Sequence, residues 1–435
     1  MELNLQDTTL DNGLKIISCK RNTAPVVSVQ VWYRVGSANE HDGIRGGSHI
    51  LEHMMFRGSD RFGPQEHARN INDVGGHSNA FTAEDVTAYL NSVPATELEM
   101  VMEMEADRMA GLTLDSQLFE TERAVIIEEY HTYMNNPVTK AFLEFRGTLF
   151  ENHPYSISPL GRIEDLQSLT VDMLRSYYNK WYAPRNAVLV VTGDFENHRG
   201  VYDMAHKYFG RLDNKDYSPD QHKNIPPIPK TSGGWMKRKV DFDVPMLIAG
   251  FKAPRAGDPA GLSLDIMQMI AAQGETSRMH LELVRRTSLA VVAGGMNHFL
   301  RLAGMSLFFT AFTPEVSVKK LDRAMAGVLG ELRGKGARSE ELEKVKNTML
   351  TGRSFELYSA ENICQRLGYA EVVEGDYNLW VQRLEALQSL TREQLLSAVR
   401  TYWDDTQRYT LYLRPRRIKP MIYLAGILRR IFSRN

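Results

Sequence analysis

The segment His49-Ile50-Leu51-Glu52-His53 constrains the folding of this chain more than any other stretch of its 435 residues. On an α-helix, positions i, i+3 and i+4 lie on one face, so the three polar side chains would point to the same side. The neighbouring apolar residues Leu51, Met54 and Met55 would then face a core. Glycines on both sides indicate a short helix, with Gly58 as its C-cap and a glycine-rich approach at Gly43, Gly46 and Gly47.

Two imidazoles one helical turn apart can hold a single Zn²⁺ ion together. The motif reads H-x-x-E-H, the reverse of the H-E-x-x-H zinc motif. Glu52 would lie close enough to take a proton from a metal-bound water, whose pKa falls towards roughly 7. The alternative is a solvated helix that carries these residues by chance.

Composition is ordinary for a globular protein of more than one domain, with 43% hydrophobic residues, 24% charged residues and a net charge of −1. This near-neutral charge argues against a nucleic-acid partner. Cys19 and Cys364 lack metal-type spacing, and we interpret them as buried, reduced thiols. The polar start and the lack of an apolar run of about 18 residues predict a cytoplasmic protein.

The C-terminal tail is strongly basic. Residues 414–435 hold seven Lys or Arg and no acid, and the segment from Met421 to Phe432 could form a basic amphipathic helix. Such a helix would allow peripheral contact with an anionic membrane. The alternatives are a helix that packs on the body or on a partner, or a frayed end.

Periodicity predicts two successive halves with the same order of elements. Strands are expected at 7–19 with a turn at 11–13, and at 26–35, 78–81, 86–91, 187–192, 246–251, 305–312 and 409–413. Helices are expected at 64–74, 95–110, 116–133, 168–181, 260–272, 277–286, 316–334, 340–357 and 391–402.

A stretch rich in Pro and Gly, Leu212–Trp235, separates the halves. We therefore expect a zinc-binding domain over 1–215, a linker over 216–236, a homologous non-catalytic domain over 237–415 and a tail over 416–435. The repeated order suggests an internal duplication. The predicted fold class is α+β, with antiparallel-type sheets and helices on one face of each sheet.

A catalytic zinc site needs a third protein ligand. Glu122 and Glu129 lie two turns apart on the helix predicted around them and share a face. That face could supply a ligand, Glu129, and a carboxylate that orients a histidine, Glu122. Glu128 points about 100° away and is expected to be solvated. Acidic helices are common, so helix geometry alone leaves open which carboxylate is the third ligand.

The motif, followed by Glu122 and Glu129, resembles the pitrilysin family of inverted-motif zinc peptidases, the inverzincins. Similar segments at 26–40, 75–82 and 105–112 extend the likeness to bacterial homologues of the mitochondrial processing peptidase β subunit. The resemblance implies one Zn²⁺ per chain on His49, His53 and Glu129, with Glu52 as base and Glu122 beside the ligands. It also implies two duplicated domains that form half of a clam-shaped chamber.

The same resemblance assigns Ser78–Thr82 to an edge strand beside the metal. Asn79, Ala80 and Phe81 would bind an extended peptide there by strand addition. The alternative is an ordinary sheet strand without a binding role.

One segment departs from the family pattern. In the family, an Arg and a Tyr of a second domain grip the substrate, and the matching run here is Val284–Val291. Arg285 or Arg286 could supply the cation, but Val291 stands at the Tyr position and cannot donate a hydrogen bond. Another tyrosine could substitute. We favour a heterodimer in which a homologous subunit supplies Arg and Tyr, in preference to a homodimer.

The sequence therefore predicts a zinc metalloendopeptidase (EC 3.4.24 class) that acts on short or unfolded peptides. Alternatives are a processing peptidase for leader or targeting segments, or an assembly subunit that retains a zinc site.

Overall fold

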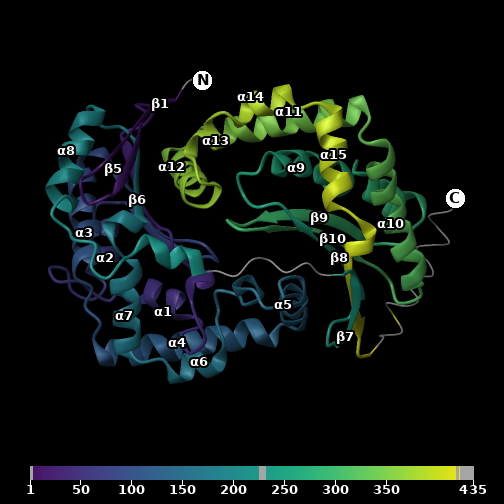
Figure 1. Ribbon diagram of the computed structural model, residues 1–435, viewed down its shortest axis with the longest axis horizontal. Coiled ribbons are helices and arrows are strands. Elements are labelled where there is room, and N and C mark those ends of the chain that lie inside the picture. The colour runs from purple at the N-terminus through teal and green to yellow at the C-terminus, as the bar shows by residue number, and fades with distance from the viewer. Residues whose placement is uncertain (1–2, 225–231, 418–420, 422–435) are drawn as a thin grey trace. The chain divides into compact units, whose positions relative to one another are not determined.

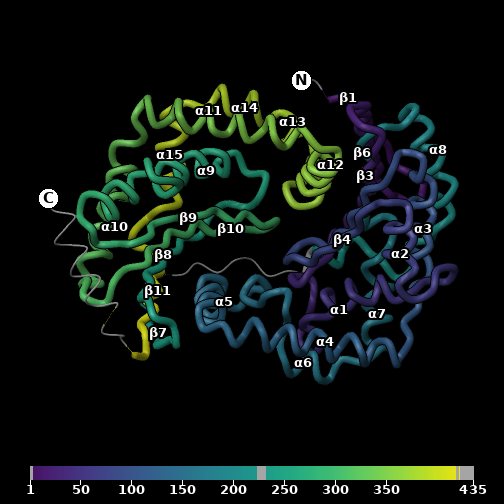
Figure 2. The backbone as a smooth tube through the Cα atoms, turned by 180° about the vertical axis from the view of Figure 1, so that it is seen from behind, coloured from purple at the N-terminus to yellow at the C-terminus, as the bar shows by residue number. Residues whose placement is uncertain are grey.

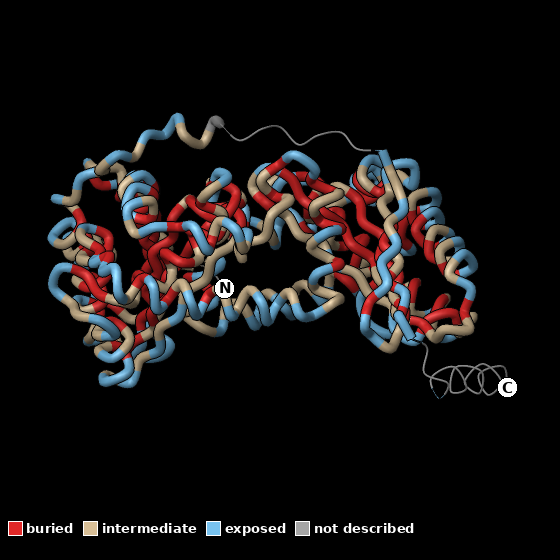
Figure 3. The backbone as a smooth tube through the Cα atoms, turned by 90° about the horizontal axis from the view of Figure 1, so that it is seen from below, coloured by how far each residue is buried: buried red, intermediate tan, exposed pale blue. Residues whose placement is uncertain are grey.

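The computed structural model describes residues 3–224, 232–417 and 421, and it divides into two compact units (Figure 1). Unit 1 comprises Met1–Thr132, His153–Pro227 and Arg353–Val381. Unit 2 comprises Tyr133–Asn152, Ile228–Gly352 and Gln382–Asn435. Buried residues, red in Figure 3, gather inside each unit. The predicted amphipathic tail helix lies outside the described residues, apart from Met421.

Unit 1 is built on a six-stranded sheet with the order β1-β2-β6-β3-β5-β4. Its neighbouring strands pair antiparallel, except that β2 and β6 are parallel. The strands are β1 (Asn4–Thr9), β2 (Lys15–Lys20), β3 (Val26–Tyr33), β4 (His77–Thr82), β5 (Thr87–Pro94) and β6 (Ala187–Gly193). The predicted hairpin and the central position of β3 are confirmed.

Unit 2 repeats this topology with five strands in the order β7-β11-β8-β10-β9. This order matches β2-β6-β3-β5-β4 of unit 1, so that β7, β8, β9, β10 and β11 correspond to β2, β3, β4, β5 and β6. In both sheets the first of these pairs is parallel and the others are antiparallel. The predicted α+β class with two homologous halves is confirmed. The strands are β7 (Gly234–Val240), β8 (Met246–Ala253), β9 (Val292–Phe299), β10 (Gly304–Ala311) and β11 (Tyr409–Pro415).

The first unit holds most of its helices against one face of the sheet, around a core that includes Val29, Val31, Leu174 and Phe209. These helices are α1 (Gly47–Met54), α2 (Glu66–Asp73), α3 (Leu98–Ala110), α4 (Ser116–Asn135), α6 (Ile163–Ser168), α7 (Val171–Trp181) and α8 (His198–Phe209). The helix predicted over 168–181 begins at Val171 instead, because Thr170 caps α7 through the N–H of Met173.

The prediction of helices on one face only is wrong. Helix α12 (Ala360–Tyr369) packs on the opposite face of the first sheet against β3 and β6, as Figure 2 shows. Helix α5 (Pro137–Leu149) packs on the second sheet against β7, β8 and β11. Each half of the chain thus gives a helix to the other unit. Strand β6 is buried at every position, because helices cover both of its faces.

The second core lies between the second sheet and helices α9, α10 and α15. The helices not yet named are α9 (Pro259–Ala272), α10 (Val318–Lys335), α11 (Ser339–Glu356), α13 (Tyr377–Val381), α14 (Arg383–Ser389) and α15 (Arg392–Tyr402). The helix expected over 277–286 is a π-helical segment, His280–Arg286. Within the described residues, every helix is too short or too polar to cross a membrane.

Candidate metal centre

Helix α1 is held at its first turn by a buried carboxylate. Glu40 accepts hydrogen bonds from the backbone N–H groups of Gly46 and Ser48, each at 2.8 Å. Burial raises the pKa of Glu40 to about 7, and the two N–H donors oppose this rise. The Ser48 hydroxyl also shares a 2.8 Å hydrogen bond with the Tyr177 hydroxyl of α7. These contacts fix the position and direction of the motif helix.

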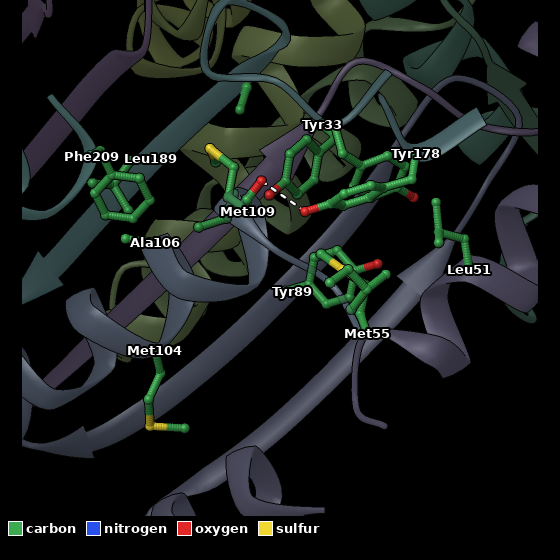
Figure 4. Packing of buried hydrophobic residues seen from close by; sticks show 14 of the residues in the cluster. Tyr33, Leu51, Met55, Tyr89, Met104, Ala106, Met109, Tyr178, Leu189 and Phe209 are labelled. Atoms are coloured by element: carbon green, nitrogen blue, oxygen red, sulfur yellow. Dashed lines mark hydrogen bonds between the residues drawn. The ribbon is translucent and has the colours of Figure 1, made fainter. Parts of the chain in front are cut away.

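The two faces of α1 separate as the motif predicts. Ile50, Leu51 and Met54 are fully buried, and so is Met55 just after the helix. Figure 4 shows Leu51 and Met55 among the side chains of the first core. The helix ends at Met54, so Gly58 is not its C-cap. Gly58 instead takes a positive φ of 119° in the turn that follows.

The opposite face carries both imidazoles, and α4 places a carboxylate beside them. His49, His53 and Glu129 each offer one ligand atom, and these atoms lie within 4.8 Å of one another. The two rings are 5.0 Å apart and nearly perpendicular. His49 Nε2 lies 3.8 Å from Glu129 Oε2. The structure therefore brings together the three residues that the sequence predicted as ligands, and Glu128 is exposed.

Glu122 lies beneath the pair and touches His53. The Nδ1 of His53 donates to Glu122 Oε2 at 3.1 Å, and Arg57 Nη2 lies 2.6 Å from Glu122 Oε1. Only 4% of the Glu122 side chain is exposed. A proton held at Nδ1 leaves Nε2 of His53 as the nitrogen with a free lone pair. Sequence reasoning missed Arg57, although a buried carboxylate usually needs a cationic partner.

Glu52 contacts the edge strand of the sheet. Thr82, the last residue of β4, donates its hydroxyl to Glu52 Oε2 at 2.5 Å. Burial raises the pKa of Glu52, the Thr82 bond and His53 lower it, and Glu129 raises it. Burial, followed by the neighbouring His53, lowers the pKa of His49 to about 4, so this imidazole is neutral at pH 7. A neutral imidazole is the form that binds a metal.

The predicted peptide-binding residues lie on β4. Within the described residues, β4 pairs with β5 alone, so its other edge keeps unpaired backbone groups. Asn79 is exposed, and Ala80 packs against the first core. Phe81 points to the other face, where its ring meets Trp32 edge-on at 5.5 Å.

The donor set fits zinc. Zn–N and Zn–O bonds of about 2.0–2.2 Å separate two ligand atoms of a tetrahedral site by roughly 3.4 Å. The 3.8 Å between His49 Nε2 and Glu129 Oε2 is close to this value. Two imidazole nitrogens and one carboxylate oxygen also match the ligand types of catalytic zinc sites.

Arg285, Arg286 and Val291, which the resemblance sets at the family's Arg and Tyr positions, belong to unit 2. Arg285 pairs with Glu275 at 2.9 Å, and Arg286 pairs with Glu282 at 2.5 Å. Val291 is 42% exposed.

Two models of one protein family match consecutive parts of the chain. Residues 15–161 match "Insulinase (Peptidase family M16)", and residues 168–349 match "Peptidase M16 inactive domain". The chain belongs to peptidase family M16, the pitrilysin-like zinc peptidases.

Relatives extend the match to nearly the whole chain. A Helicobacter pylori protein named zinc protease PqqE is 28% identical over 94% of this chain and 93% of its own length. A solved protease structure from the same organism has a TM-score of 0.87 and 27% identity, covering 95% of this chain and 100% of the other. An Arabidopsis thaliana protein named a probable mitochondrial-processing peptidase subunit beta is 26% identical over 67% of this chain and 56% of its own.

Proposed function

We propose that this chain is a zinc metalloendopeptidase that hydrolyses short or unfolded peptides. The observation that carries the proposal is the group of His49, His53 and Glu129 with a half-buried carboxylate, Glu52, on the same helix face as the two histidines. One Zn²⁺ ion per chain would be held by these three ligands. We assign the site to a catalytic domain at 1–215 and regard 237–415 as its non-catalytic homologue.

When bound, zinc would lower the pKa of a water ligand towards roughly 7 and polarise the peptide carbonyl. Glu52 takes a proton from the attacking water and later gives it to the departing amine nitrogen. Burial raises the pKa of Glu52, and a carboxylate with a raised pKa is a stronger base than a solvated one. Thr82 holds the Glu52 carboxylate in place, and Glu122 orients His53.

The substrate would add to the sheet as a further strand beside β4. Its backbone would pair with the free edge near Asn79, Ala80 and Phe81. The proposal is supported by the position of Thr82, which ends β4 and touches Glu52. Main-chain pairing of this kind needs an extended peptide, so folded domains would be poor substrates.

We further propose that a homologous subunit completes the site. Val291 stands where the family places a Tyr donor, and an isopropyl group cannot polarise a carbonyl. The isolated chain would then bind zinc and cleave peptides slowly. Full activity of the chain alone would refute this heterodimer.

A processing peptidase for leader segments is the second candidate, and it is favoured by the similarity to a relative named as a processing peptidase subunit. Cleavage of a defined leader peptide at one site, compared with random peptides, separates the two. A scaffold role has less support, because a structural site has no use for a carboxylate like Glu52.

The test of the proposed function is Glu52→Gln, with the exposed Glu128→Gln as matched control. Both variants should keep one zinc per chain by elemental analysis. Glu52→Gln should lose nearly all hydrolysis in the presence of the co-purified partner, and Glu128→Gln should keep it. His49→Ala should lose zinc and activity together. Wild-type turnover by Glu52→Gln would end the proposal.

A further inference from the structure

The face of the first sheet that α12 covers, called here the α12 face, stays partly open. Helix α12 contacts β3 and β6, and β5 and β4 lie beyond it towards the sheet edge. Side chains alternate between the faces of a strand, so every second residue of β4 points to this side. Phe81 does so, because its ring meets Trp32, which packs under Gly368 of α12.

Strand register defines two rows of side chains across the α12 face. Trp32 pairs with Ala88, and Ala88 pairs with Phe81. In the second row, Ser28 lies four residues before Trp32 in β3. It pairs with Ser92 of β5, and Ser92 pairs with His77 of β4. The hydroxyls of Ser28 and Ser92 are 3.4 Å apart, which places that row on one face. The rows therefore end at Phe81 and His77 on β4.

A cavity lies at the end of each row. The first, the aromatic cavity, has a volume of about 330 Å³, and its lining includes the aromatic residues Trp32, Phe81 and Tyr369 and the amides Asn362 and Gln365. Its charged lining residues, Arg366 and Glu356, neutralise each other in a 2.6 Å ion pair. A neutral ring or a long aliphatic side chain fits such a lining best.

The second cavity, the valine cavity, has a volume of about 440 Å³ and includes His77 in its lining. Its apolar lining residues are Ala24, Val26, Pro94 and Ala360, together with Val27 and Val93, whose side chains belong to the first core. Arg21 and Glu361 also line it. Tyr358 also lines it and is 83% exposed. An exposed tyrosine beside these apolar residues favours a large hydrophobic side chain as the occupant.

We propose that the two cavities are subsites that select peptides with bulky apolar side chains four residues apart. The inference rests on the proposed function, because it assumes a peptide paired with the free edge of β4. Residues pair one to one in a sheet, so peptide residues beside Phe81 and His77 are also four apart, in either strand direction. They would lie roughly 13 Å from each other on the α12 face.

The two subsites differ in their distance from the proposed chemistry. Phe81 precedes Thr82, whose hydroxyl bonds to Glu52, so the aromatic cavity takes a side chain near the scissile bond. His77 begins β4, and the valine cavity is therefore remote. Remote contacts supply binding energy that holds the peptide in register at the reacting atoms.

Binding to the full-length Glu52→Gln chain tests the inference without turnover. The probes are fluorescein-labelled, otherwise polar peptides that carry two leucines three, four or five residues apart. We expect the spacing of four to lower Kd about tenfold relative to three and five, since one well-filled apolar pocket discriminates by at least that factor. Equal binding at all spacings, or no binding, would overturn the proposal.

Tyr358→Ala assigns the remote subsite, with Phe355→Ala as matched control. Both aromatic residues are strongly exposed, at 83% and 71%, and Phe355 does not line either cavity. Tyr358→Ala should reduce the preference for the spacing of four at least threefold. Phe355→Ala should leave it unchanged, and equal effects of the two variants would count against the valine cavity.

Kinetics then separate the two proposals. Glu52-dependent hydrolysis without any dependence on leucine spacing would remove the subsites and leave the peptidase intact. A clear spacing preference in binding, without Glu52-dependent hydrolysis, would keep the subsites and remove the proposed function.

Discussion

Glu122 offers a sharp test of how the site is built, because both of its oxygens are in use. Oε2 accepts from His53 Nδ1, and Oε1 faces Arg57. In Glu122→Gln, one of these donors must meet an NH₂ group in place of an oxygen. If the amide oxygen stays with Arg57, the NH₂ group faces His53 Nδ1. The imidazole then rotates, or it moves its proton to Nε2, the nitrogen that would bind zinc.

The size of the effect follows from the two partners that Glu122 holds. Removal of a group that orients a metal-binding histidine lowers metal affinity about 10- to 100-fold, or about 1.4–2.7 kcal/mol. Glu122 is buried and also balances the charge of Arg57, so we expect the upper half of that range. Competition of the purified chain with a chromophoric zinc chelator measures the affinity directly.

The control is Glu128→Gln on the same helix, where the carboxylate is exposed. It should bind zinc like the wild type, and urea unfolding should show that both variants fold. A Glu122→Gln chain that binds zinc as tightly as the control would refute the role given to Glu122.

Two further substitutions probe the base and the exchanged helix. Thr82→Val removes a donor that lowers the pKa of Glu52, so that pKa should rise. Since the base acts in its ionised form, the acid limb of kcat/KM against pH should move to higher pH, and a shift to lower pH would contradict the assignment. Gly368→Ala would place a Cβ 2.3 Å from the Trp32 indole and should lower the free energy of unfolding by about 1–3 kcal/mol. The Cβ of Gly352→Ala in α11 meets open space, so this variant should raise the free energy of unfolding by up to about 1 kcal/mol. If both alanines change the free energy of unfolding in the same direction, the packing of α12 on Trp32 is refuted.

The sequence was informative where a local pattern determines geometry. A helix of period 3.6 places His49, Glu52 and His53 on one face whatever surrounds it. The same period pairs Glu122 with Glu129 two turns apart. That the helix of His49 and His53 packs beside the helix of Glu122 and Glu129 depends on tertiary structure. Only the family resemblance predicted this contact from the sequence.

Sequence periodicity could not predict contacts between segments that are distant in the sequence. Thr82 lies 30 residues from Glu52, and Arg57 is one of many arginines in the chain. The capping role of Glu40 was missed because a glycine, Gly46, occupies the N-cap and the carboxylate comes from six residues earlier.

The exchange of α5 and α12 between the units was also missed. Their sequences show where helices can form, but not which sheet they cover. The signal lay in the strands: the apolar run of β6 has no polar face, and such a strand needs cover on both sides.

Anomalous diffraction at the zinc edge, from crystals of the zinc-loaded chain, tests the central claim most directly. We expect one strong peak per chain, about 2.0–2.2 Å from a nitrogen of His49, a nitrogen of His53 and an oxygen of Glu129. No peak at this position, or a peak held by other residues, would contradict the claim.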